Sequence, residues 1–508
     1  MKQGKRKSIA KIFHRWGGLV LSLFLVGFSL SGILLNHRRL IASWDLPRGL
    51  LPRSYHVDGW TQGAAVGSVA LGRDSVLLYG GEGIWLTQDR GQHFIPFMEG
   101  LPKGADRRLM RRMVYNTRRG AFALSQDALY QLEGERWNKV DLPLDETLTD
   151  LALQGDSLVV MGRSHLFITQ LPYQQFSVLT LPASPDLPEH RTTLFRTLWA
   201  LHSGEMFHLV GRLFVDALGV VLLLLSLSGV LMFFLPRYMK RLQRRSAEQY
   251  RTRIKRRVAR LQKRLKRYDR LHRVLGYWLF IPLFLLVLTG MFLRPPLLVA
   301  VAKPKVPTCP GTALHSDNPW DDALRRMVYS PWKQAWILST REGVFRCSRL
   351  GLPMEKIEKT PPISVMGAHV FQLEKGKPDV LLVGSFMGLF RWDLSTGEVT
   401  DLYTGGAPEP VGFMPLGEHK VAGYAGDLGS ARGIAFEYDV PCREIAQPEE
   451  MGKGRISLFY AMLELHTGRL YVFLGPLGIL WIFLSGSMML WLLISGWQRL
   501  RKRAKRKA

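Results

Sequence analysis

The chain of 508 residues is poor in cysteine and has only Cys309, Cys347 and Cys442. Three cysteines cannot build a disulfide framework, although one bridge with one free thiol left over is possible. The absence of a Cys-x-x-Cys-His motif excludes covalently attached c-type haem. No Gly-x-Gly-x-x-Gly follows a predicted strand and no Gly-x4-Gly-Lys-[Ser/Thr] occurs, so the chain has no recognisable nicotinamide or flavin domain.

Acidic residues are also scarce, because 41 Asp and Glu face 69 Lys and Arg, which gives a net charge of +28. The whole excess lies in three basic patches, residues 1–15, 237–273 and 499–508. The rest of the chain is neutral, which argues against a soluble DNA-binding protein and leaves nucleic acid out as a partner. Each basic patch adjoins a long apolar run, so the charge predicts membrane topology.

Four apolar runs are long enough to cross about 30 Å of hydrocarbon as helices. They comprise approximately residues 17–35, 213–235, 274–293 and 475–497. When these spans alternate in direction, all three basic patches lie on one side of the membrane. The positive-inside rule then predicts a multi-pass protein of the bacterial inner membrane with both termini in the cytoplasm. The first run lacks a small-residue cleavage site, so we predict that it is retained.

The predicted spans divide the chain into eight segments. Six of them are cytoplasmic or membrane segments: 1–37 (tail and first helix), 201–236 (second helix), 237–271 (basic loop), 272–299 (third helix), 463–498 (fourth helix) and 499–508 (tail). The two long segments 38–200 and 300–462 are expected in the periplasm. The basic loop is expected to form a helical hairpin or an interfacial helix on anionic lipid.

An internal duplication relates the two halves of the chain. A first group of residues recurs 258 positions later: His14-Arg15, Gly18 and Ser31-Gly32 correspond to His272-Arg273, Gly276 and Thr289-Gly290. A second group recurs 264 positions later: Leu201-His202-Ser203-Gly204, Phe207 and Gly211 correspond to Leu465-His466-Thr467-Gly468, Tyr471 and Gly475. The protein is therefore predicted to be two copies of one unit, helix, outer segment and helix, with four membrane helices in one bundle.

The predicted topology sorts the repeated histidines by depth. His14 and His272 are expected at the cytoplasmic ends of their helices, and His202 and His466 at the outer ends. Each depth receives one histidine from each half, which suits two haem b groups, each bound between two imidazoles. Glycines near these histidines would let a porphyrin approach the backbone: Gly17, Gly18, Gly204, Gly276 and Gly468. Arg15 and Arg273 could pair with haem propionates.

Other assignments stay open at this point. Histidines and arginines at membrane interfaces also snorkel, and glycines also let helices pack closely. Zinc is disfavoured because neither depth offers cysteine or carboxylate ligands at the expected spacing. His208 and His37 are alternate outer ligands, although neither has a histidine at the equivalent position of the other half. Asp216, the one acid within a span, is expected to pair with Arg212, and a proton or propionate contact is the alternative.

These residues resemble the PepSY-associated transmembrane family. In that family, four-helix proteins carry His-Arg-x-x-Gly-like entries on alternate helices and Leu-His-[Ser/Thr]-Gly entries on the others. Some relatives are di-haem b reductases of the inner membrane that act on ferric siderophores. The resemblance implies that His14, His272, His202 and His466 ligate haem iron. It covers the four spans and their flanks, and neither outer segment contains a recognisable PepSY domain.

The two outer segments instead read as short strands separated by turn signals. Thr87–Phe94 fits the Asp-box pattern [Ser/Thr]-x-Asp-x-Gly-x-x-aromatic, in which Asp and Gly shape a turn. Arg111–Tyr115 recurs as Arg325–Tyr329. About six such units at roughly 35–45-residue spacing predict one β-propeller assembled from both segments. No catalytic constellation is evident there, so this part is expected to bind or dock a partner.

We therefore expect an inner-membrane di-haem b protein that carries electrons across the lipid bilayer. The donor would be a quinol or a separate protein. The periplasmic acceptor would be a ferric chelate such as a siderophore, another metal, or a partner protein, and with a ferric acceptor the protein would be a haem-dependent reductase. The alternative from another class is a haem-free, membrane-anchored β-propeller that serves binding, sensing or complex assembly.

Overall fold

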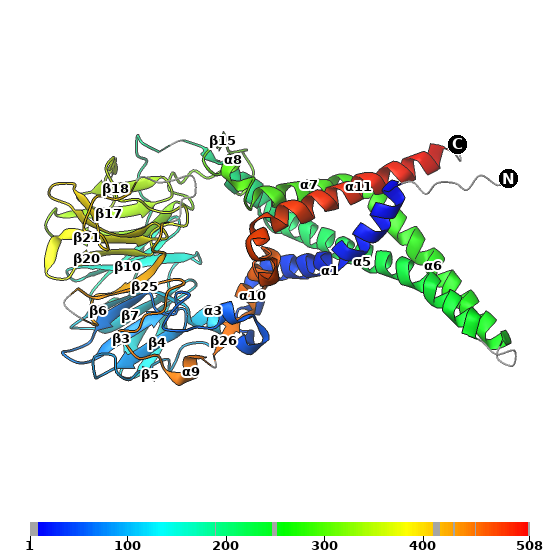
Figure 1. The fold of residues 1–508 in the computed structure, drawn as a ribbon. Helices are drawn as coiled ribbons and strands as arrows, with labels where there is room; N and C mark the ends of the chain where they lie inside the picture. The colour runs from blue at the N-terminus through cyan, green and yellow to red at the C-terminus, as the bar shows by residue number, and fades with distance from the viewer. Residues whose placement is uncertain are drawn as a thin grey trace. The chain divides into compact units, whose positions relative to one another are not determined.

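The chain forms two compact units in the computed structural model (Figure 1). The structure describes residues 9–187, 189–245, 251–409, 417–429, 432–452 and 454–505. The helical unit contains residues 1–41, 190–315 and 459–508, and the sheet unit contains residues 42–189 and 316–458. Both long segments between the apolar runs therefore contribute to a single sheet unit.

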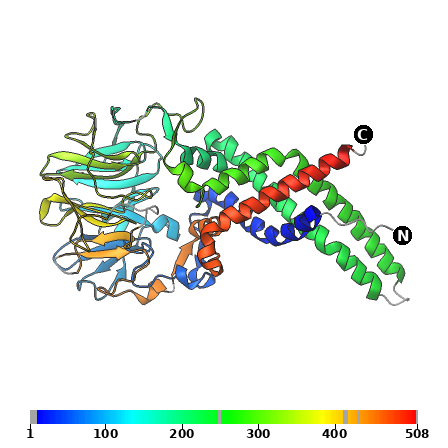
Figure 2. The same cartoon turned by 45° about the horizontal axis from the view of Figure 1, so that its top comes forward.

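Three helices among the described residues are long and apolar enough to cross a membrane, and a bent helix pair makes a fourth candidate. The three are α1 (Ile9–Asn36), α5 (His208–Arg245) and α11 (Trp481–Lys505), the last preceded by the short helix η5 (Val472–Leu480). Helices α5 and α6 (Arg251–Trp278) run side by side in both views (Figure 1, Figure 2).

The third predicted span is not one straight helix. Helix α6 ends at Trp278, and α7 (Phe280–Phe292) continues at an angle of 69°. Pro282 lies in the first turn of α7 and cannot donate a hydrogen bond to a carbonyl four residues earlier, so the regular ladder breaks there. The apolar pattern predicted the span but not its bend.

Two short helices precede the second and fourth spans. Helix α4 (Leu194–Ser203) and helix α10 (Leu458–His466) end at equivalent glycines, Gly204 and Gly468, with φ of 78° and 77°. This left-handed backbone is accessible to glycine without strain and terminates a helix. His202 and His466 therefore lie on separate short helices rather than at the ends of α5 and α11. The one-turn helix η3 (Glu205–Phe207) joins α4 to α5.

The spanning helices share one apolar core. Its buried residues come from α1, α5, α7 and α11: Leu21, Leu218, Leu222, Leu225, Leu283, Met489, Leu492 and Leu493. The core combines helices from both halves of the duplication. Shorter helices elsewhere are α2 (Arg38–Ile41), α3 (Ala105–Arg108), α8 (Leu298–Ala302), α9 (Glu449–Gly452), η1 (Arg48–Leu50) and η2 (Arg53–Tyr55).

The sheet unit consists of antiparallel strands that pair mostly in chain order. Among the described residues, four sheets have four strands each and one sheet has six. The strands of the first segment are β2 (Gly67–Ala70), β3 (Val76–Gly80), β4 (Gly83–Thr87), β5 (Ile95–Pro96), β6 (Met110–Asn116), β7 (Gly120–Ser125), β8 (Leu129–Glu133), β9 (Arg136–Val140), β10 (Leu148–Gln154), β11 (Ser157–Gly162), β12 (Leu166–Gln170) and β13 (Ser177–Leu179). Sheets β6–β9 and β10–β13 are separate, whereas β2–β5 belong to a six-stranded sheet.

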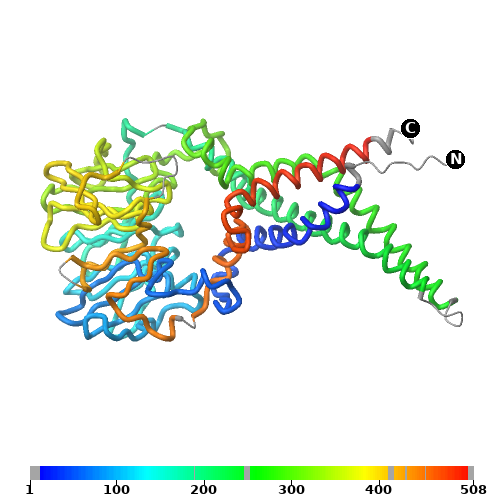
Figure 3. Tube along the Cα trace, viewed as in Figure 1, coloured from blue at the N-terminus to red at the C-terminus, as the bar shows by residue number. Residues whose placement is uncertain are grey.

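The second segment repeats this pattern. Its strands are β16 (Leu324–Ser330), β17 (Ala335–Thr340), β18 (Gly343–Cys347), β19 (Glu355–Lys356), β20 (Val370–Glu374), β21 (Lys377–Ser385), β22 (Gly388–Asp393), β23 (Val399–Asp401), β24 (Val421–Ala425) and β25 (Ile434–Glu437). Strand β24 lies parallel to β2 through the pair Gly67 and Tyr424, which completes the six-stranded sheet. In Figure 3, orange segments from late in the chain run beside blue segments from early in the chain within the sheet unit. Two small ladders pair β1 (Asp45–Pro47) with β26 (Arg455–Ser457) and β14 (Arg191–Thr193) with β15 (Lys305–Pro307).

Each sheet buries both of its faces. In β7, Ala121 and Ala123 pack in a cluster with β2–β4, whereas Phe122 and Leu124 pack in a cluster with β10–β12. Successive side chains of a strand point to opposite faces, so a continuous apolar strand serves two cores. Five hydrophobic clusters among the described residues join neighbouring sheets in this way. A sixth cluster joins β24 and β25 to β3 and β4 within the six-stranded sheet.

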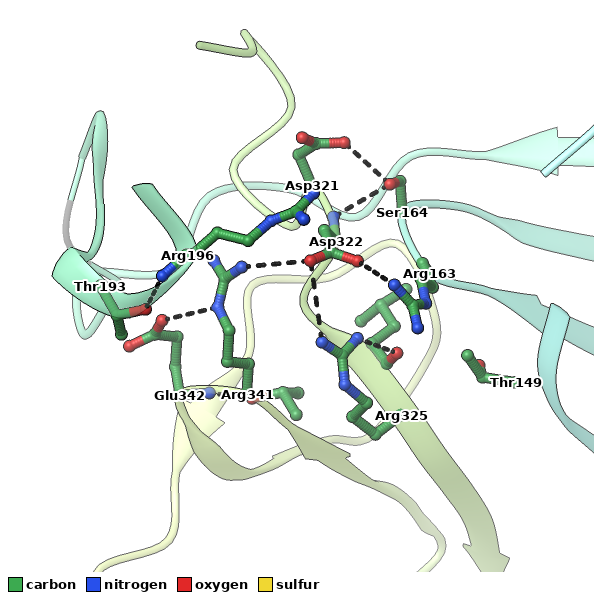
Figure 4. A network of polar contacts seen from close by, with 12 residues as sticks. Thr149, Arg163, Ser164, Thr193, Arg196, Asp321, Asp322, Arg325, Arg341 and Glu342 are labelled. Carbon is green, nitrogen blue, oxygen red and sulfur yellow. Dashed lines mark hydrogen bonds and ion pairs between the residues drawn. The ribbon is translucent and has the colours of Figure 1, made fainter. Parts of the chain in front are cut away.

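Polar contacts also connect the two segments of the sheet unit. Figure 4 shows Ser164 donating to Asp321 over 2.8 Å and Arg163 donating to Asp322 over 2.9 Å. The second oxygen of Asp322 faces Arg341 at 3.5 Å. These contacts lie where β10–β13 meet β16–β19, so the first segment is bonded to the second.

The repeated Arg-Arg-Met-Val-Tyr stretches lie on β6 and β16. Arg112 and Arg326, which occupy the same position of the repeat, both approach one carboxylate oxygen of Asp150, at 3.6 and 3.5 Å. Asp150 has no exposed surface, and its other oxygen accepts a hydrogen bond from the backbone N–H of Met327 over 2.8 Å. Asp150 of the first segment therefore contacts both copies of the Arg-Arg-Met-Val-Tyr repeat.

The Asp-box forms a turn after β4. The Thr87 hydroxyl accepts a hydrogen bond from the Gly91 N–H, and Asp89 accepts hydrogen bonds from the N–H groups of Gln92 and His93. Phe94 is buried in a hydrophobic cluster. These side chains are used to shape the turn and anchor it, which agrees with a structural role.

Candidate functional site

The helical unit contains a cavity of about 580 Å³. His14 from α1 and His272 from α6 both line it, one from each half of the duplication. Its other walls are mostly apolar side chains of α5 and α11: Leu222, Leu225, Met232, Phe233, Met489, Leu492, Leu493 and Trp497. A cavity of this size and lining, entered by two imidazoles, can accommodate a large apolar cofactor.

Each histidine of this first pair, His14 and His272, contacts a hydroxyl on a neighbouring helix. The Nδ1 atom of His14 lies 3.0 Å from the Oγ of Ser495 on α11. The Nδ1 atom of His272 lies 3.0 Å from the Oγ of Ser228 on α5. Because Nδ1 is occupied in both rings, Nε2 is the nitrogen left for a metal.

The other two repeated histidines form a second pair. The rings of His202 on α4 and His466 on α10 have centroids 6.0 Å apart and an interplanar angle of 51°. The Nδ1 atom of His466 lies 3.0 Å from the Oγ of Ser31, and that of His202 lies 3.3 Å from the Oγ1 of Thr289. The second pair therefore repeats the contacts of the first pair with different helices.

The two pairs offer different features that suit haem, a ring separation at the second pair and an open cavity wall at the first. Two imidazoles that share one ion, each with a metal–nitrogen bond of about 2 Å, have ring centroids about 6 Å apart, which is the separation of His202 and His466. At the first pair, a Cβ added to Gly18 or Gly276 would meet no atom closer than 4.0 or 3.9 Å. These two glycines leave the cavity wall open where a side chain would enter it.

Three arginines line the same cavity. Arg273 pairs with Asp269 over 2.9 Å, and the guanidinium of Arg15 lies 5.0 Å from the centre of the Phe233 ring. The Nη2 atom of Arg499 is buried and has no hydrogen-bond partner among the described residues. A buried N–H group without a partner is costly, and a propionate carboxylate would satisfy it. Sequence reasoning missed Arg499 because it falls within a basic patch and has no counterpart in the repeat.

The alternate ligands lie elsewhere. His37 is engaged through Nε2 with Asp216 over 2.8 Å, and Asn36 donates to the other oxygen of Asp216 over 2.9 Å. His208 is exposed and begins α5 with a φ of 54°. Neither residue joins the second pair.

The expected ion pair between Asp216 and Arg212 is wrong. Arg212 is exposed, and among the described residues it makes no ion pair with Asp216. The spacing of four residues was suitable, but α1 packs against α5, and its last residue Asn36 and the following His37 contact Asp216 instead. A partner from another helix cannot be read from local spacing.

Three of the five glycines named for porphyrin approach have other roles. A Cβ at Gly17 would lie 2.8 Å from the Cε of Met488, so Gly17 permits close contact between α1 and α11. Gly204 and Gly468 end α4 and α10 in the left-handed conformation. The remaining two, Gly18 and Gly276, line the cavity.

The cysteines carry free thiols, and no disulfide joins them. Cys309 is exposed, Cys347 is buried and Cys442 is half-buried. The one possible bridge is therefore not formed. Burial raises the pKa of the Cys347 thiol to about 11, which disfavours its reactive thiolate.

Comparison with known proteins identifies the family. The model of the PepSY-associated TM region matches residues 11–503. No curated protein matches the chain. Among solved structures, the extracellular domain of a protein described as a one-component system of B. thetaiotaomicron is 9% identical, with a TM-score of 0.32, and the match covers 70% of this chain and 29% of that one. A second structure, the extracellular domain of a protein described as a hybrid two-component system of the same organism, is also 9% identical, with a TM-score of 0.31. That match covers 68% of this chain and 28% of the other.

The chain thus spans less than a third of the length of the structures that it matches, and likeness at this level carries no argument. The family match, by contrast, extends over nearly the whole chain, including the four apolar segments and the repeated histidines. The chain belongs to the PepSY-associated TM family.

Proposed function

We propose that this protein is a di-haem b protein of the bacterial inner membrane that transfers electrons to an acceptor outside the cytoplasm. The observation that carries the proposal is the pairing of histidines across the duplication. One pair lines a 580 Å³ cavity and the other has ring centroids 6.0 Å apart. Four unrelated histidines would not be expected to meet as two equivalent pairs.

The chain's own residues would hold each cofactor. The first pair would ligate one haem iron and the second pair the other, both through Nε2. Arg15, Arg273 and Arg499 would neutralise propionates at the first pair, and the apolar walls would exclude water. The chemistry that a bound haem supplies is one-electron transfer.

The distribution of basic residues supports an outward direction of transfer. The three basic patches support a cytoplasmic location for both termini and for the α5–α6 connection, and the sheet unit would then face the periplasm. A quinol that gives up two electrons and two protons would reduce two ferric ions to ferrous ions. A ferric chelate is the acceptor class that we favour. A separate protein is the alternative to a quinol as the electron donor.

We further propose that the sheet unit is a six-bladed β-propeller that binds or docks the acceptor or a partner protein. Support comes from the order of the six hydrophobic clusters, which link each group of strands to the next and the last to the first. Arg112 of β6 also donates to Gln372 of β20 over 3.2 Å, although two groups of strands separate them in the chain. Such a contact is expected when inner strands surround one axis.

A reduced-minus-oxidised visible spectrum of the purified full-length protein tests the function. We expect a b-type signal and two haems per chain. His272→Ala should remove one haem and His466→Ala the other, whereas His208→Ala should keep both. A protein that is folded and lacks b-type haem would contradict the proposal and leave the haem-free binding protein.

A further inference from the structure

We propose that Ser31, Ser228, Thr289 and Ser495 are positioning residues that keep the proton of each ligand histidine on Nδ1 and aim its bare Nε2 at the haem iron. The inference rests on the proposed function and adds to it the protonation state of each ligand. All four hydroxyls precede a glycine, in the pairs Ser31-Gly32, Ser228-Gly229, Thr289-Gly290 and Ser495-Gly496.

Each hydroxyl has a single proton, and a carbonyl oxygen of its own helix lies within hydrogen-bond distance to accept it. The Ser31 hydroxyl donates to the carbonyl of Gly27 over 2.7 Å, and that of Thr289 to the carbonyl of Leu285 over 2.8 Å. A hydroxyl that has given away its proton can only accept, so the imidazole Nδ1 must donate.

The first pair follows the same rule. The Ser228 hydroxyl donates to the carbonyl of Leu225 over 3.1 Å, and the Ser495 hydroxyl donates to the carbonyl of Leu492 over 3.2 Å. Each hydroxyl is left with lone pairs for the histidine at 3.0 Å. His272 and His14 therefore also carry the proton on Nδ1.

Backbone carbonyls give independent support at the second pair. The Nδ1 atom of His466 lies 3.0 Å from the carbonyl oxygen of Phe28, and that of His202 lies 3.0 Å from the carbonyl oxygen of Leu286. A carbonyl oxygen has no proton to give, so both Nδ1 atoms must be donors. Two acceptors per ring leave little freedom for rotation.

The glycine of each pair lets the imidazole lie against the helix backbone. An added Cβ would come within 3.1 Å of the His466 Cε1 at Gly32 and within 2.7 Å of the His202 Cε1 at Gly290. At Gly496 the distance to the His14 Cε1 would be 3.3 Å. A side chain at these three glycines would push the ring and turn Nε2, whereas a Cβ at Gly229 would lie 3.7 Å from the His272 Cε1, an ordinary contact.

Every one of these contacts crosses between the two halves of the duplication. His14 and His202 of the first half contact Ser495 and Thr289 of the second half. His272 and His466 of the second half contact Ser228 and Ser31 of the first half. Each half therefore orients the ligands that the other half supplies.

Hydrogen-bond donation from Nδ1 makes Nε2 a stronger base, which favours ferric over ferrous iron. Removal of the hydroxyl should raise the midpoint potential of that haem alone, and by less at the second pair, where a carbonyl oxygen still accepts from Nδ1. Redox titration of the full-length, haem-loaded protein measures this shift. Ser228→Ala and Ser495→Ala should raise the potential of one haem, and Ser31→Ala and Thr289→Val that of the other, with two haems retained in each variant.

Conservative variants separate positioning from packing. Ser31→Thr and Ser228→Thr keep the hydroxyl, as Thr289 does naturally, and should keep the wild-type potentials. Unchanged potentials in all four hydroxyl-deleted variants would overturn the inference, even if their thermal unfolding temperatures fall. Threonine variants that keep both haems but shift the potentials as the hydroxyl-deleted variants do would also contradict it.

A haem-free measurement separates this inference from the proposed function. In protein selectively labelled with ¹⁵N-histidine and prepared without haem, the ¹⁵N shifts of these four rings should report a proton on Nδ1. A proton on Nε2 would overturn the inference. Wild-type protein that never binds haem but shows the Nδ1 form would instead contradict the proposed function alone.

Discussion

Some residues around the cavity are tightly packed against a neighbouring helix, and others face open space. Gly17 and Gly18 are neighbours on α1, yet a Cβ at Gly17 would lie 2.8 Å from Met488, whereas a Cβ at Gly18 would meet nothing closer than 4.0 Å. Sequence spacing alone treats both as equal. Their difference depends on which way each faces, and therefore on helix packing.

Gly18→Leu should block the proposed haem site at His14 and His272 without harming the haem-free protein. Leucine forms helix better than glycine by roughly 1 kcal/mol, and its side chain would enter the cavity. We expect loss of one of two haems by pyridine haemochrome assay and an unchanged or higher unfolding temperature of the haem-free form. Gly17→Leu is the matched control, since it should disturb packing against Met488. Full haem content in Gly18→Leu would contradict the assignment.

The repeat revealed the four candidate haem ligands but not Arg499, which lines the same cavity as His14 and His272. His14, His272, His202 and His466 were predicted because equivalent residues recur in both halves. Arg499 has no such partner, and only its buried Nη2 without a hydrogen-bond acceptor marks it. Recurrence detects residues that follow the symmetry and misses those that break it.

A buried histidine, His369, joins two elements of the sheet unit, β20 and β24, and its surroundings favour the neutral imidazole. His369, just before β20, donates from Nδ1 to the carbonyl of Val421 on β24 over 2.7 Å. Burial lowers the pKa of His369 below its ordinary value of 6.5, and the nearby guanidinium of Arg326 lowers it further. The hydrogen bond to Val421 opposes this shift but does not reverse it.

Acidification should therefore loosen this junction. Because the folded pKa lies below the unfolded one, the stabilisation is complete above pH 6.5 and is lost as pH falls below it, by at most about 1.4 kcal/mol per pH unit. Thermal unfolding of the full chain between pH 7.5 and 5 measures the effect. His369→Gln should reduce the pH dependence of the unfolding temperature. His93→Gln, at an exposed site, should leave that dependence unchanged. Equal slopes in both variants would be evidence against a buried neutral His369.

The sequence predicted the presence of the membrane helices but not where they bend or break. The apolar runs predicted the helices, since hydropathy depends only on composition along the chain. The bend of 69° between α6 and α7 and the separation of α4 from α5 were not predicted. Pro282 and Gly204 are visible in the sequence, but glycine and proline are common in membrane helices and do not always break them.

The molecule as a whole is assembled from two sequence segments that lie far apart in the chain. Asp150 of the first segment contacts Arg326 and Met327 of the second, and the carboxylate is completely buried. Removal of one partner of a buried ion pair leaves an uncompensated charge and is more damaging than loss of a surface pair.

Asp150→Ala should destabilise the sheet unit by about 3–5 kcal/mol. Asp156→Ala removes a pair with Arg118 in which the carboxylate is 60% exposed, and should cost no more than about 1 kcal/mol. Urea unfolding of the full chain, followed by tryptophan fluorescence, compares the two variants. Equal midpoints would mean that the Asp150 contacts do not hold the segments together.

The sequence by itself determined the apolar spans, the basic patches, the duplication and the four repeated histidines, because these follow from composition and recurrence along the chain. It also indicated strands in both long segments. The tertiary structure was required to show that Nδ1 of each histidine meets a hydroxyl of the opposite half, that His37 rather than Arg212 pairs with Asp216, and that Gly18 faces a cavity. The hydrogen bonds among them join residues between 44 and 481 positions apart in the chain, and no local pattern records them.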